Sequence, residues 1–421
     1  MKSTRSLNRI IIIFALLIAG HALTAKVSAF DNLPVDYDGS MMPYNFTAND
    51  TIVLGGDTLK PVFVSYVARH GARYLSSPDK VSHLKTLLTE QAAKGNLTPA
   101  GIDFMERMIQ IDTLSAVKWG RLSPLGIYEE QRLGSQMSHF LPQLLKQGKI
   151  RAISTSKPRV VLSMYQFLHA LEQANTQLVL STLSGGSADD LLRCFDSNPD
   201  YKSYRATITR SDAYRNFFNI HVPQSPAMRL FVNPDFDFDA RTTTMNMYEV
   251  MQAFESSGLP APTTEWMSPE EYRSCWLTEN LEHYLRNSVN NISDIAAIAS
   301  RPLLHKIIDD ADNALEHPAI SPRQQLKMNA YFGHAETLMP LFALMKLPGC
   351  YAVTDNYDNL DTQWQVENIT PLGANLAVIF LKGSDGLYTL IRLNGQYIPY
   401  RDGAPLIVSW PTLRSYWQQL L

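Results

Sequence analysis

The chain has 421 residues, of which 45% are hydrophobic and 18% are charged, and its formal net charge is −3. This length suits one large domain or two smaller ones, and the composition is that of an ordinary soluble globular protein. A mildly acidic chain argues against nonspecific binding to nucleic acid, although it permits a local basic pocket.

Residues 1–29 have the pattern of a secretory signal peptide. Three basic residues precede the apolar run 10–20, and the tripeptide that ends at Ala29 suits cleavage by signal peptidase. A membrane anchor is the less favoured alternative, because the run is shorter than the roughly 20 residues that a spanning helix needs. We therefore predict an exported protein, periplasmic or secreted, with no stable membrane insertion after cleavage. Cleavage would change the formal charge from −3 to −7, because it removes four basic residues and no acidic one.

The sequence contains three cysteines, Cys194, Cys275 and Cys350. In an exported protein this odd number allows at most one internal disulfide, and the sequence does not determine the pairing. The wide spacing of the cysteines does not fit a zinc site.

The first part of the chain predicts an irregular lead-in, a strand and a helix. Residues 30–60 are rich in turn-forming residues. The run 61–68, "PVFVSYVA", is short, β-branched and aromatic, which predicts a buried strand. The segment 81–95 has a helical pattern that stops at Gly95.

The next segments continue this alternation. Residues 123–149 predict a second helical stretch, residues 150–156 a strand that ends in hydroxyl side chains, and residues 159–175 another helix. Strands alternating with helices indicate an α/β sheet.

The later part of the chain changes character and then returns to strands. Helical segments joined by loops dominate residues 183–300, whereas residues 374–383 and 388–399 have the length and composition of paired strands. We predict an α/β fold with a sheet core flanked by helices, built from residues 30–182 and 301–421. Residues 183–300 would form a second, mainly helical lobe inserted into it.

Three polar clusters follow predicted strands or begin predicted helices. They are "RHGAR" (69–73), "STSKPR" (154–159) and "GHAET" (333–337). Because ligands of open α/β sheets bind at the carboxyl ends of the strands, these clusters are the candidate site.

The cluster "RHGAR" has the side chains of an oxyanion site. Arg69 and Arg73 each offer a planar fork of donors that matches phosphate oxygens. Gly71 would let the backbone turn sharply and approach an anion, and His70 could act as a nucleophile on phosphorus. Taken alone, the same residues also fit a surface turn with an isolated histidine.

The other two clusters are individually ambiguous. His334 at a helix start could face an anion together with free backbone N–H groups, and Glu336 could protonate a leaving oxygen. A histidine and a glutamate at that position also fit a helix cap and a partner of the helix dipole. Arg159 alone fits a solvated side chain.

As a set, the three clusters resemble those of the histidine acid phosphatases, the branch of the histidine phosphatase superfamily that includes the phytases. The resemblance extends from the strand at 61–68 to the terminal stretch 390–399, "LIRLNGQYIP". The His-Ala-Glu of residues 334–336 is similar to multiple inositol polyphosphate phosphatases, whose bacterial relatives are exported. The common phytases carry His-Asp there. Leu75 stands where the family usually has proline. This difference affects the shape of the loop more than the chemistry of the site.

The resemblance implies a mechanism without a metal or other cofactor. His70 would be the nucleophile that forms a phosphohistidine, and Glu336 would be the acid that protonates the departing oxygen. The residues implied to bind the phosphate oxygens are Arg69, Arg73, Arg159 and His334. For a densely anionic substrate we add Lys80 as a binding residue, with Lys157, Lys202 and Arg205 as less favoured candidates.

The favoured function is therefore an exported phosphatase acting on inositol phosphates such as phytate. A broad-specificity acid or sugar phosphatase on the same scaffold is the alternative, and a non-catalytic phosphoanion-binding protein is less favoured because both His70 and Glu336 are present. A phosphoglycerate mutase is disfavoured by the export pattern and the helical insertion.

Overall fold

The structure, a computed structural model, describes residues 37–46, 59–317, 319 and 321–421. The predicted signal peptide, its cleavage site and much of the predicted lead-in lie outside these residues. Within the described part of the chain, no helix combines the length and the apolar character needed to cross a membrane.

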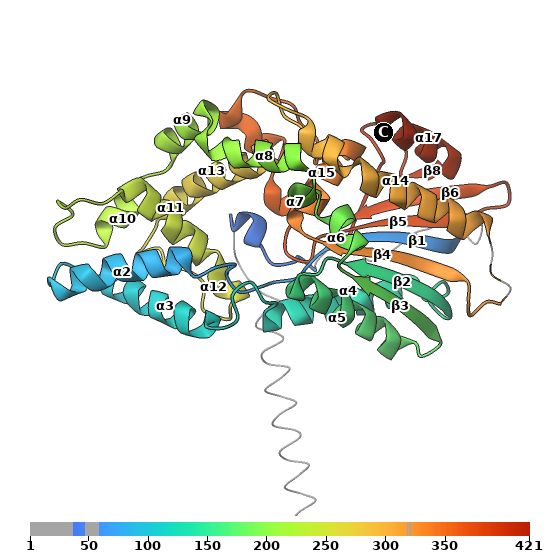
Figure 1. The fold of residues 1–421 in the computed structure, drawn as a ribbon, viewed down its shortest axis with the longest axis horizontal. Coiled ribbons are helices and arrows are strands. Elements are labelled where there is room, and N and C mark those ends of the chain that lie inside the picture. Colours follow the sequence, from blue (N-terminus) through green and yellow to red (C-terminus); the bar gives the residue numbers. More distant parts are fainter. Residues whose placement is uncertain (1–36, 47–58, 318, 320) are drawn as a thin grey trace, which may run out of the picture. The chain divides into compact units, whose positions relative to one another are not determined.

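A mixed sheet of eight strands is the centre of the described structure (Figure 1). Its order is β3-β2-β4-β1-β5-β6-β7, and β8 pairs with β6. The neighbours β3, β2, β4 and β1 are parallel, whereas β5, β6 and β7 are antiparallel to their neighbours. The strands are β1 (Lys60–Arg69), β2 (Gly148–Ser154), β3 (Leu178–Ser184), β4 (Leu326–Gly333), β5 (Asn375–Lys382), β6 (Leu387–Leu393), β7 (Gln396–Ile398) and β8 (Ile407–Ser409).

Helices connect the strands and cover both faces of the sheet (Figure 1). The 3-10 helices are η1 (Gly39–Met41), η2 (Ile208–Arg210) and η3 (Tyr357–Thr362). The α-helices are α2 (Asp79–Ala93), α3 (Pro99–Ser115), α4 (Pro124–Phe140), α5 (Pro158–Ala174), α6 (Ser187–Leu192), α7 (Cys194–Ser197), α8 (Pro199–Thr207), α9 (Asp212–His221), α10 (Ser225–Arg229), α11 (Ala240–Met251), α12 (Ala253–Ser256), α13 (Pro269–Asn287), α14 (Ile295–Glu316), α15 (Ala335–Met345), α16 (Val366–Ile369) and α17 (Trp410–Leu420).

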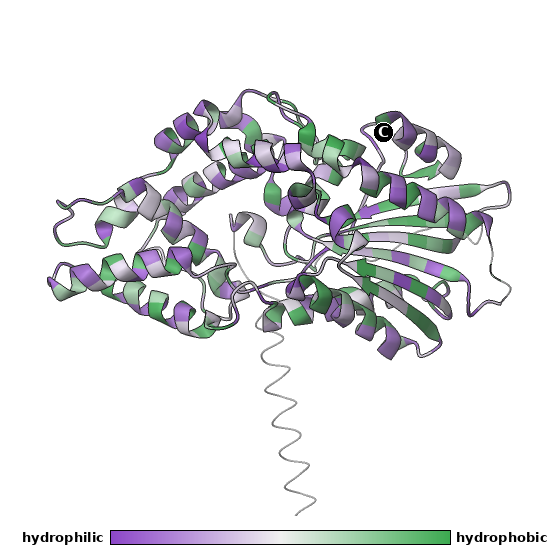
Figure 2. Ribbon diagram, viewed as in Figure 1, coloured by the Kyte–Doolittle hydropathy of each residue, from purple (hydrophilic) through white to green (hydrophobic). Residues whose placement is uncertain are grey.

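Strand β1 is buried on both faces. Tyr66 packs with residues of α4 and α5, whereas Phe63 and Val67 pack with residues of α14, α15 and α17. Burial on both faces explains why the run is almost continuously apolar rather than alternating. Figure 2 shows the same contrast, since the strands are largely hydrophobic while the helices carry hydrophilic residues as well.

The structure confirms the predicted α/β class with a sheet core flanked by helices. Strands β1, β2 and β5 and helices α2 and α5 lie where the sequence predicts them. The predicted helix 123–149 is too long: α4 ends at Phe140, shortly before Pro142, which cannot continue a helix.

One strand prediction at the end of the chain is wrong. Residues 388–399 form two strands, β6 and β7, rather than one. The turn between them is Asn394 and Gly395, which both have positive φ, 46° and 82°. Asn-Gly is the residue pair that favours a two-residue hairpin turn, so this turn could have been predicted from the sequence.

Helices follow one another between the end of β3 at Ser184 and the start of β4 at Leu326 in the described chain. Helices α2 and α3, which precede this part in sequence, lie beside α10 and α11 (Figure 1). The Thr98 N–H donates to the Leu230 carbonyl at 3.0 Å, and a Cβ added to Gly101 would meet that carbonyl oxygen at 2.1 Å. Helices α2 and α3, which belong to the proposed core, therefore contact the proposed helical lobe. The division into a core and an inserted lobe stays a prediction.

All three cysteines, Cys194, Cys275 and Cys350, are buried and free. The single internal disulfide that the sequence allowed is not formed in this structure.

Replacing Phe167 with alanine tests how α5 is held on the sheet. The ring of Phe167 is fully buried and stacks on Tyr66 at 4.9 Å between centroids. We expect Phe167→Ala to lower the free energy of unfolding by about 3–5 kcal/mol, measured by urea denaturation. His169→Ala, an exposed change on the same helix, should shift it by less than about 0.5 kcal/mol. Equal effects of the two variants would contradict this packing.

Candidate active site

The three polar clusters meet at one edge of the sheet. The parallel strands β2, β4 and β1 are neighbours, and the register pairs Arg69 with Gly333 and Ser154 with Phe332. The residues that follow these strand ends therefore lie side by side, as expected for a ligand site of an α/β sheet. Clusters separated by more than 80 residues in sequence thus form one site.

His70 is a buried, neutral imidazole. Its Nδ1 lies 2.9 Å from the carbonyl oxygen of Gly71, and because a carbonyl only accepts, Nδ1 must carry the proton. The other ring nitrogen, Nε2, then keeps its lone pair. Burial, followed by the charges of Arg159 and Arg69, holds the pKa of His70 well below its ordinary value. A neutral ring of this kind can act as a nucleophile at neutral pH without an additional base.

His334 lies beside it, with 5.5 Å between the two ring centroids. Its Nδ1 is 3.4 Å from Nη2 of Arg159, which can only donate, so Nδ1 accepts. Its Nε2 lies 3.2 Å from Oγ1 of Thr155 and carries the proton in the neutral ring. Burial and the charge of Arg159 lower the pKa of His334 to about 3. The protonated Nε2 thus donates to the hydroxyl of Thr155.

Two arginines of the "RHGAR" cluster are held by backbone carbonyls. Nη1 of Arg69 donates to Ser40 and Thr370 carbonyl oxygens at 2.5 and 2.6 Å, and Nη1 of Arg73 donates to that of Tyr74 at 3.0 Å. Burial and neighbouring cations lower the pKa of Arg69 to about 10 and that of Arg73 to about 9. Both side chains therefore stay cationic at neutral pH.

Five arginines in the described part of the chain have a buried Nε without a hydrogen-bond partner, and all five belong to this region. They are Arg69, Arg73, Arg159, Arg193 and Arg205. Arg193 acts electrostatically on both Arg159 and His334, and Arg205 lies at Glu336. Buried donors without partners are uncommon in folded proteins, and several guanidinium groups together suit an anion with many oxygens.

Glu336 lies in the first turn of α15 with its side chain 32% exposed. Its Oε1 is 3.5 Å from Nη2 of Arg205, which comes from α8. Burial raises the pKa of Glu336, but the opposing effects of Arg205 and His334 outweigh it and hold the pKa at about 2. Glu336 is therefore a carboxylate at neutral pH in this structure.

The loop that carries His70 is anchored on α4 and α5. The Ala72 N–H donates to Glu129 Oε2 at 2.6 Å, and the Gly71 N–H donates to Ser163 Oγ at 3.1 Å. A Cβ at Gly71 would lie 2.7 Å from the Gly126 carbonyl oxygen. The sequence-based explanation of Gly71 is thus incomplete: the residue must be glycine because the loop approaches α4 closely.

Lys80 is placed differently from the other predicted site residues. It forms an ion pair with Glu249 of α11, and its side chain is 43% exposed.

Arg193 and Phe195 belong to the site but were not predicted, whereas Thr155 lies in the predicted cluster 154–159 without having been assigned a role. The ring of Phe195 packs edge-on against His334 at 5.5 Å between centroids, and the Arg205 guanidinium lies 5.3 Å from the Phe195 centroid. The sequence around Arg193, "LLRCF", has no pattern that marks a ligand site, because these contacts depend on where α7 packs.

No group of three or more metal-ligating side chains occurs among the residues that the structure describes. The polar groups that converge here are instead cations and histidines, which suit an anion.

Comparison with known proteins agrees with this geometry. The sequence model of the "Histidine phosphatase superfamily (branch 2)" matches residues 62–394. "Multiple inositol polyphosphate phosphatase 1" of Homo sapiens is 23% identical over 338 residues, which cover 74% of this chain and 66% of that protein. The chain thus spans slightly less than two thirds of this relative.

Two solved structures share the fold. The multiple inositol polyphosphate phosphatase of Bifidobacterium longum in complex with phosphate has a TM-score of 0.76 at 16% identity, covering 90% of this chain and 97% of that one. The phytase from D. castellii has a TM-score of 0.69 at 13% identity, covering 91% and 84%.

The protonation of Glu129 should make stability depend on pH. Burial, opposed by the N–H groups of Tyr44 and Ala72, raises the pKa of Glu129 from 4.5 to about 7. Between these values the folded state binds more protons than the unfolded state, so the free energy of unfolding falls as pH rises, by about 3 kcal/mol for this group. Urea denaturation of Glu129→Gln between these pH values should show a smaller decrease than wild type. The exposed Glu172→Gln should keep the wild-type slope, and an unchanged slope in Glu129→Gln would contradict the assignment.

Proposed function

Because the chain belongs to branch 2 of the histidine phosphatase superfamily, we propose that it is an exported phosphomonoesterase that hydrolyses inositol polyphosphates such as phytate. The reaction would proceed through a phosphohistidine intermediate. The observation that carries this proposal is the gathering of a neutral His70 and five arginines with unpaired Nε atoms at the ends of three parallel strands.

In the first step, Nε2 of His70 attacks phosphorus in line with the ester bond. The Nε2–P bond forms, the bond from phosphorus to the inositol oxygen breaks, and the departing oxygen takes a proton from Glu336. Arg69, Arg73, Arg159 and His334 bind the non-bridging oxygens, whose negative charge they stabilise without rearrangement.

In the second step, Glu336 acts as a carboxylate. It takes a proton from water, whose oxygen attacks phosphorus, and the Nε2–P bond breaks to release inorganic phosphate. His70 returns to its neutral form, with the proton on Nδ1 kept by the Gly71 carbonyl throughout.

The acid role requires that substrate raises the pKa of Glu336. In the structure, Arg205 helps to hold this pKa at about 2, so the carboxyl is ionised. A bound phosphate group brings negative charge close to both Arg205 and Glu336, which partly cancels the effect of the arginine and favours protonation. Arg205 is thus proposed to switch Glu336 between its acid and base forms.

Inositol polyphosphates are the favoured substrate class for two reasons. The site gathers more cationic side chains than a single phosphate group needs, because Arg193 and Arg205 lie beyond Arg69, Arg73 and Arg159. The human relative is named an inositol polyphosphate phosphatase, and a Bifidobacterium longum enzyme of similar fold has been solved with inositol hexasulfate. Lys80 is kept as a proposed contact to an outer phosphate, for which it would have to leave Glu249.

A broad-specificity acid or sugar phosphatase is the second candidate. The residues proposed to bind phosphate would contact only the phosphate group, so their geometry also suits other phosphate esters. A comparison of kcat/KM for phytate and for p-nitrophenyl phosphate separates the two, and a large preference for the small ester would replace the first proposal by the second.

Removal of the nucleophile is the first test. We expect His70→Ala to lower kcat for phosphate release from phytate by about 10³-fold or more, because the covalent step is lost. His169→Ala, an exposed histidine, should keep wild-type activity. The fold of both variants is checked by circular dichroism. Substantial turnover by folded His70→Ala would contradict the proposed nucleophile.

Removal of the Arg205 charge tests the control of Glu336. Without this cation the pKa of Glu336 rises, so the carboxyl keeps its proton to higher pH. We expect the alkaline limb of the pH profile of kcat/KM to move to higher pH in Arg205→Met and to stay near its wild-type position in Arg205→Lys. The control is Lys202→Met, which removes an exposed charge from the same helix. A profile of Arg205→Met that coincides with wild type would contradict the role of Arg205.

A further inference from the structure

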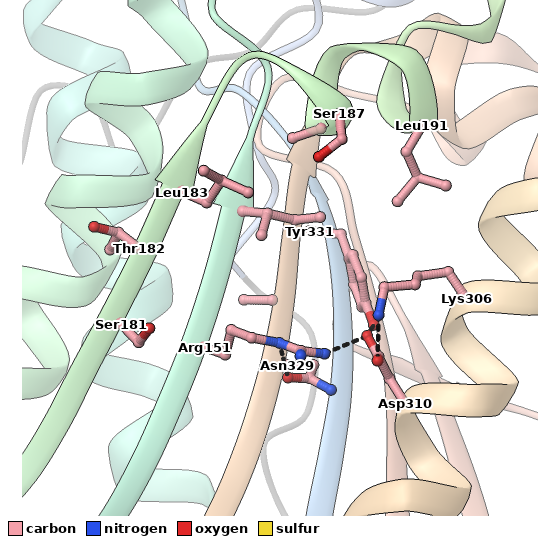
Figure 3. Close-up of a pocket in the computed structure, with 13 residues that line it drawn as sticks. Arg151, Ser181, Thr182, Leu183, Ser187, Leu191, Lys306, Asp310, Asn329 and Tyr331 are labelled. Atoms are coloured by element: carbon pink, nitrogen blue, oxygen red, sulfur yellow. Dashed lines mark hydrogen bonds and ion pairs between the residues drawn. The ribbon is translucent and has the colours of Figure 1, made fainter.

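A cavity of about 390 Å³ lies on one face of the sheet (Figure 3). Strands β2, β3 and β4 form its floor, and helices α6 and α14 contribute to its walls. None of the residues assigned above to the active site lines it. Its volume lies in the range that small-molecule sites occupy.

One end of the cavity carries a surplus of positive charge. The buried carboxylate of Asp310 forms ion pairs with both Arg151 and Lys306 and accepts a hydrogen bond from the Tyr331 hydroxyl at 2.5 Å. Two cations therefore share one carboxylate, as the dashed lines in Figure 3 show. The side chains of Arg151 and Lys306 remain 38% and 41% exposed, so both can still meet a ligand.

Asn329 adds a buried donor at the same end. Nε of Arg151 donates to Asn329 Oδ1 at 3.0 Å, which fixes the orientation of the amide because an arginine cannot accept. The residue is 1% exposed, and its Nδ2 has no hydrogen-bond partner. A buried donor left without a partner is unfavourable, and an acceptor in the cavity would relieve this cost.

The other end of the cavity is more apolar. Leu183 of the edge strand β3 and Leu191 of α6 lie there together with Ser187 (Figure 3), and Ile153 and Ala188 also line the cavity. Leu183 is 51% exposed. A ligand that covers it would remove apolar surface from water.

We propose that this cavity is a second ligand site, which binds a small organic carboxylate with a short apolar chain. The carboxylate lies at Arg151, Lys306 and Asn329, and the chain extends toward Leu183 and Leu191. A surplus of one positive charge matches a monoanion, whereas a polyphosphate would leave most of its charge uncompensated. The site therefore differs in ligand class from the active site and does not depend on the phosphatase proposal.

Calorimetric titration with octanoate tests this proposal. Inorganic phosphate in excess occupies the arginines of the active site during the titration. We expect one octanoate per chain, and weaker binding of octanol, which keeps the apolar chain but lacks the charge.

Two variants distinguish the cavity from nonspecific binding. Ser181→Trp fills the cavity from β3 and should weaken octanoate binding at least tenfold, about 1.4 kcal/mol. Val179→Trp adds the same ring on the same face of β3 outside the lining and should bind as wild type. Arg151→Met, which removes a charged donor, should also weaken binding roughly tenfold. An unchanged circular dichroism spectrum and an unchanged midpoint of urea denaturation of Ser181→Trp would verify that it folds.

The proposal is overturned if wild type does not bind octanoate, or if Ser181→Trp binds it as tightly as wild type does. Equal affinity for octanol and octanoate would show that Arg151 and Lys306 do not bind the carboxylate.

Discussion

Buried positive charge is the constraint on which the active site depends. Arg69, Arg73 and Arg159 converge at the ends of three parallel strands. Burial, together with the charges of Arg159 and Arg69, lowers the pKa of both His70 and His334, and Arg73 also lowers that of His70. In the proposed mechanism the same charges have two effects: they would attract phosphate oxygens, and they help to keep His70 neutral. Repulsion among these cations must be opposed by the rest of the structure, through the carbonyl groups of Ser40 and Thr370 and the carboxylate of Glu336.

The sheet provides the rigidity that this arrangement needs. β1 is buried on both faces, and its register with β4 fixes Arg69 opposite Gly333, so that His70 and His334 follow at adjacent positions. The helical part contributes Arg205 of α8, which pairs with Glu336 of α15. In the proposed mechanism, phosphate-binding residues that follow the strands would thus be combined with a residue from the helical part that controls the acid.

The sequence predicts those features that depend on local pattern. The strand before "RHGAR" is recognisable because burial on both faces requires a continuous apolar run. The set of His70, Arg159 and His334 could be assembled because parallel strand ends meet at one edge of a sheet. Features that depend on tertiary packing were missed: Arg193 and Phe195 reach the site only through the placement of α7. The pairing of Lys80 with Glu249 also depends on how α2 packs against α11.

The most direct test of this account is a rapid alkaline quench of Glu336→Gln during turnover of p-nitrophenyl phosphate, whose leaving group departs without a proton from Glu336. Without the carboxylate, water is not activated, so the covalent intermediate should accumulate. The account predicts a phosphoryl group on the peptide that contains His70, labile in acid and stable in alkali, identified by mass spectrometry. A phosphoryl group on another residue, or release of phosphate without any covalent intermediate, would contradict it.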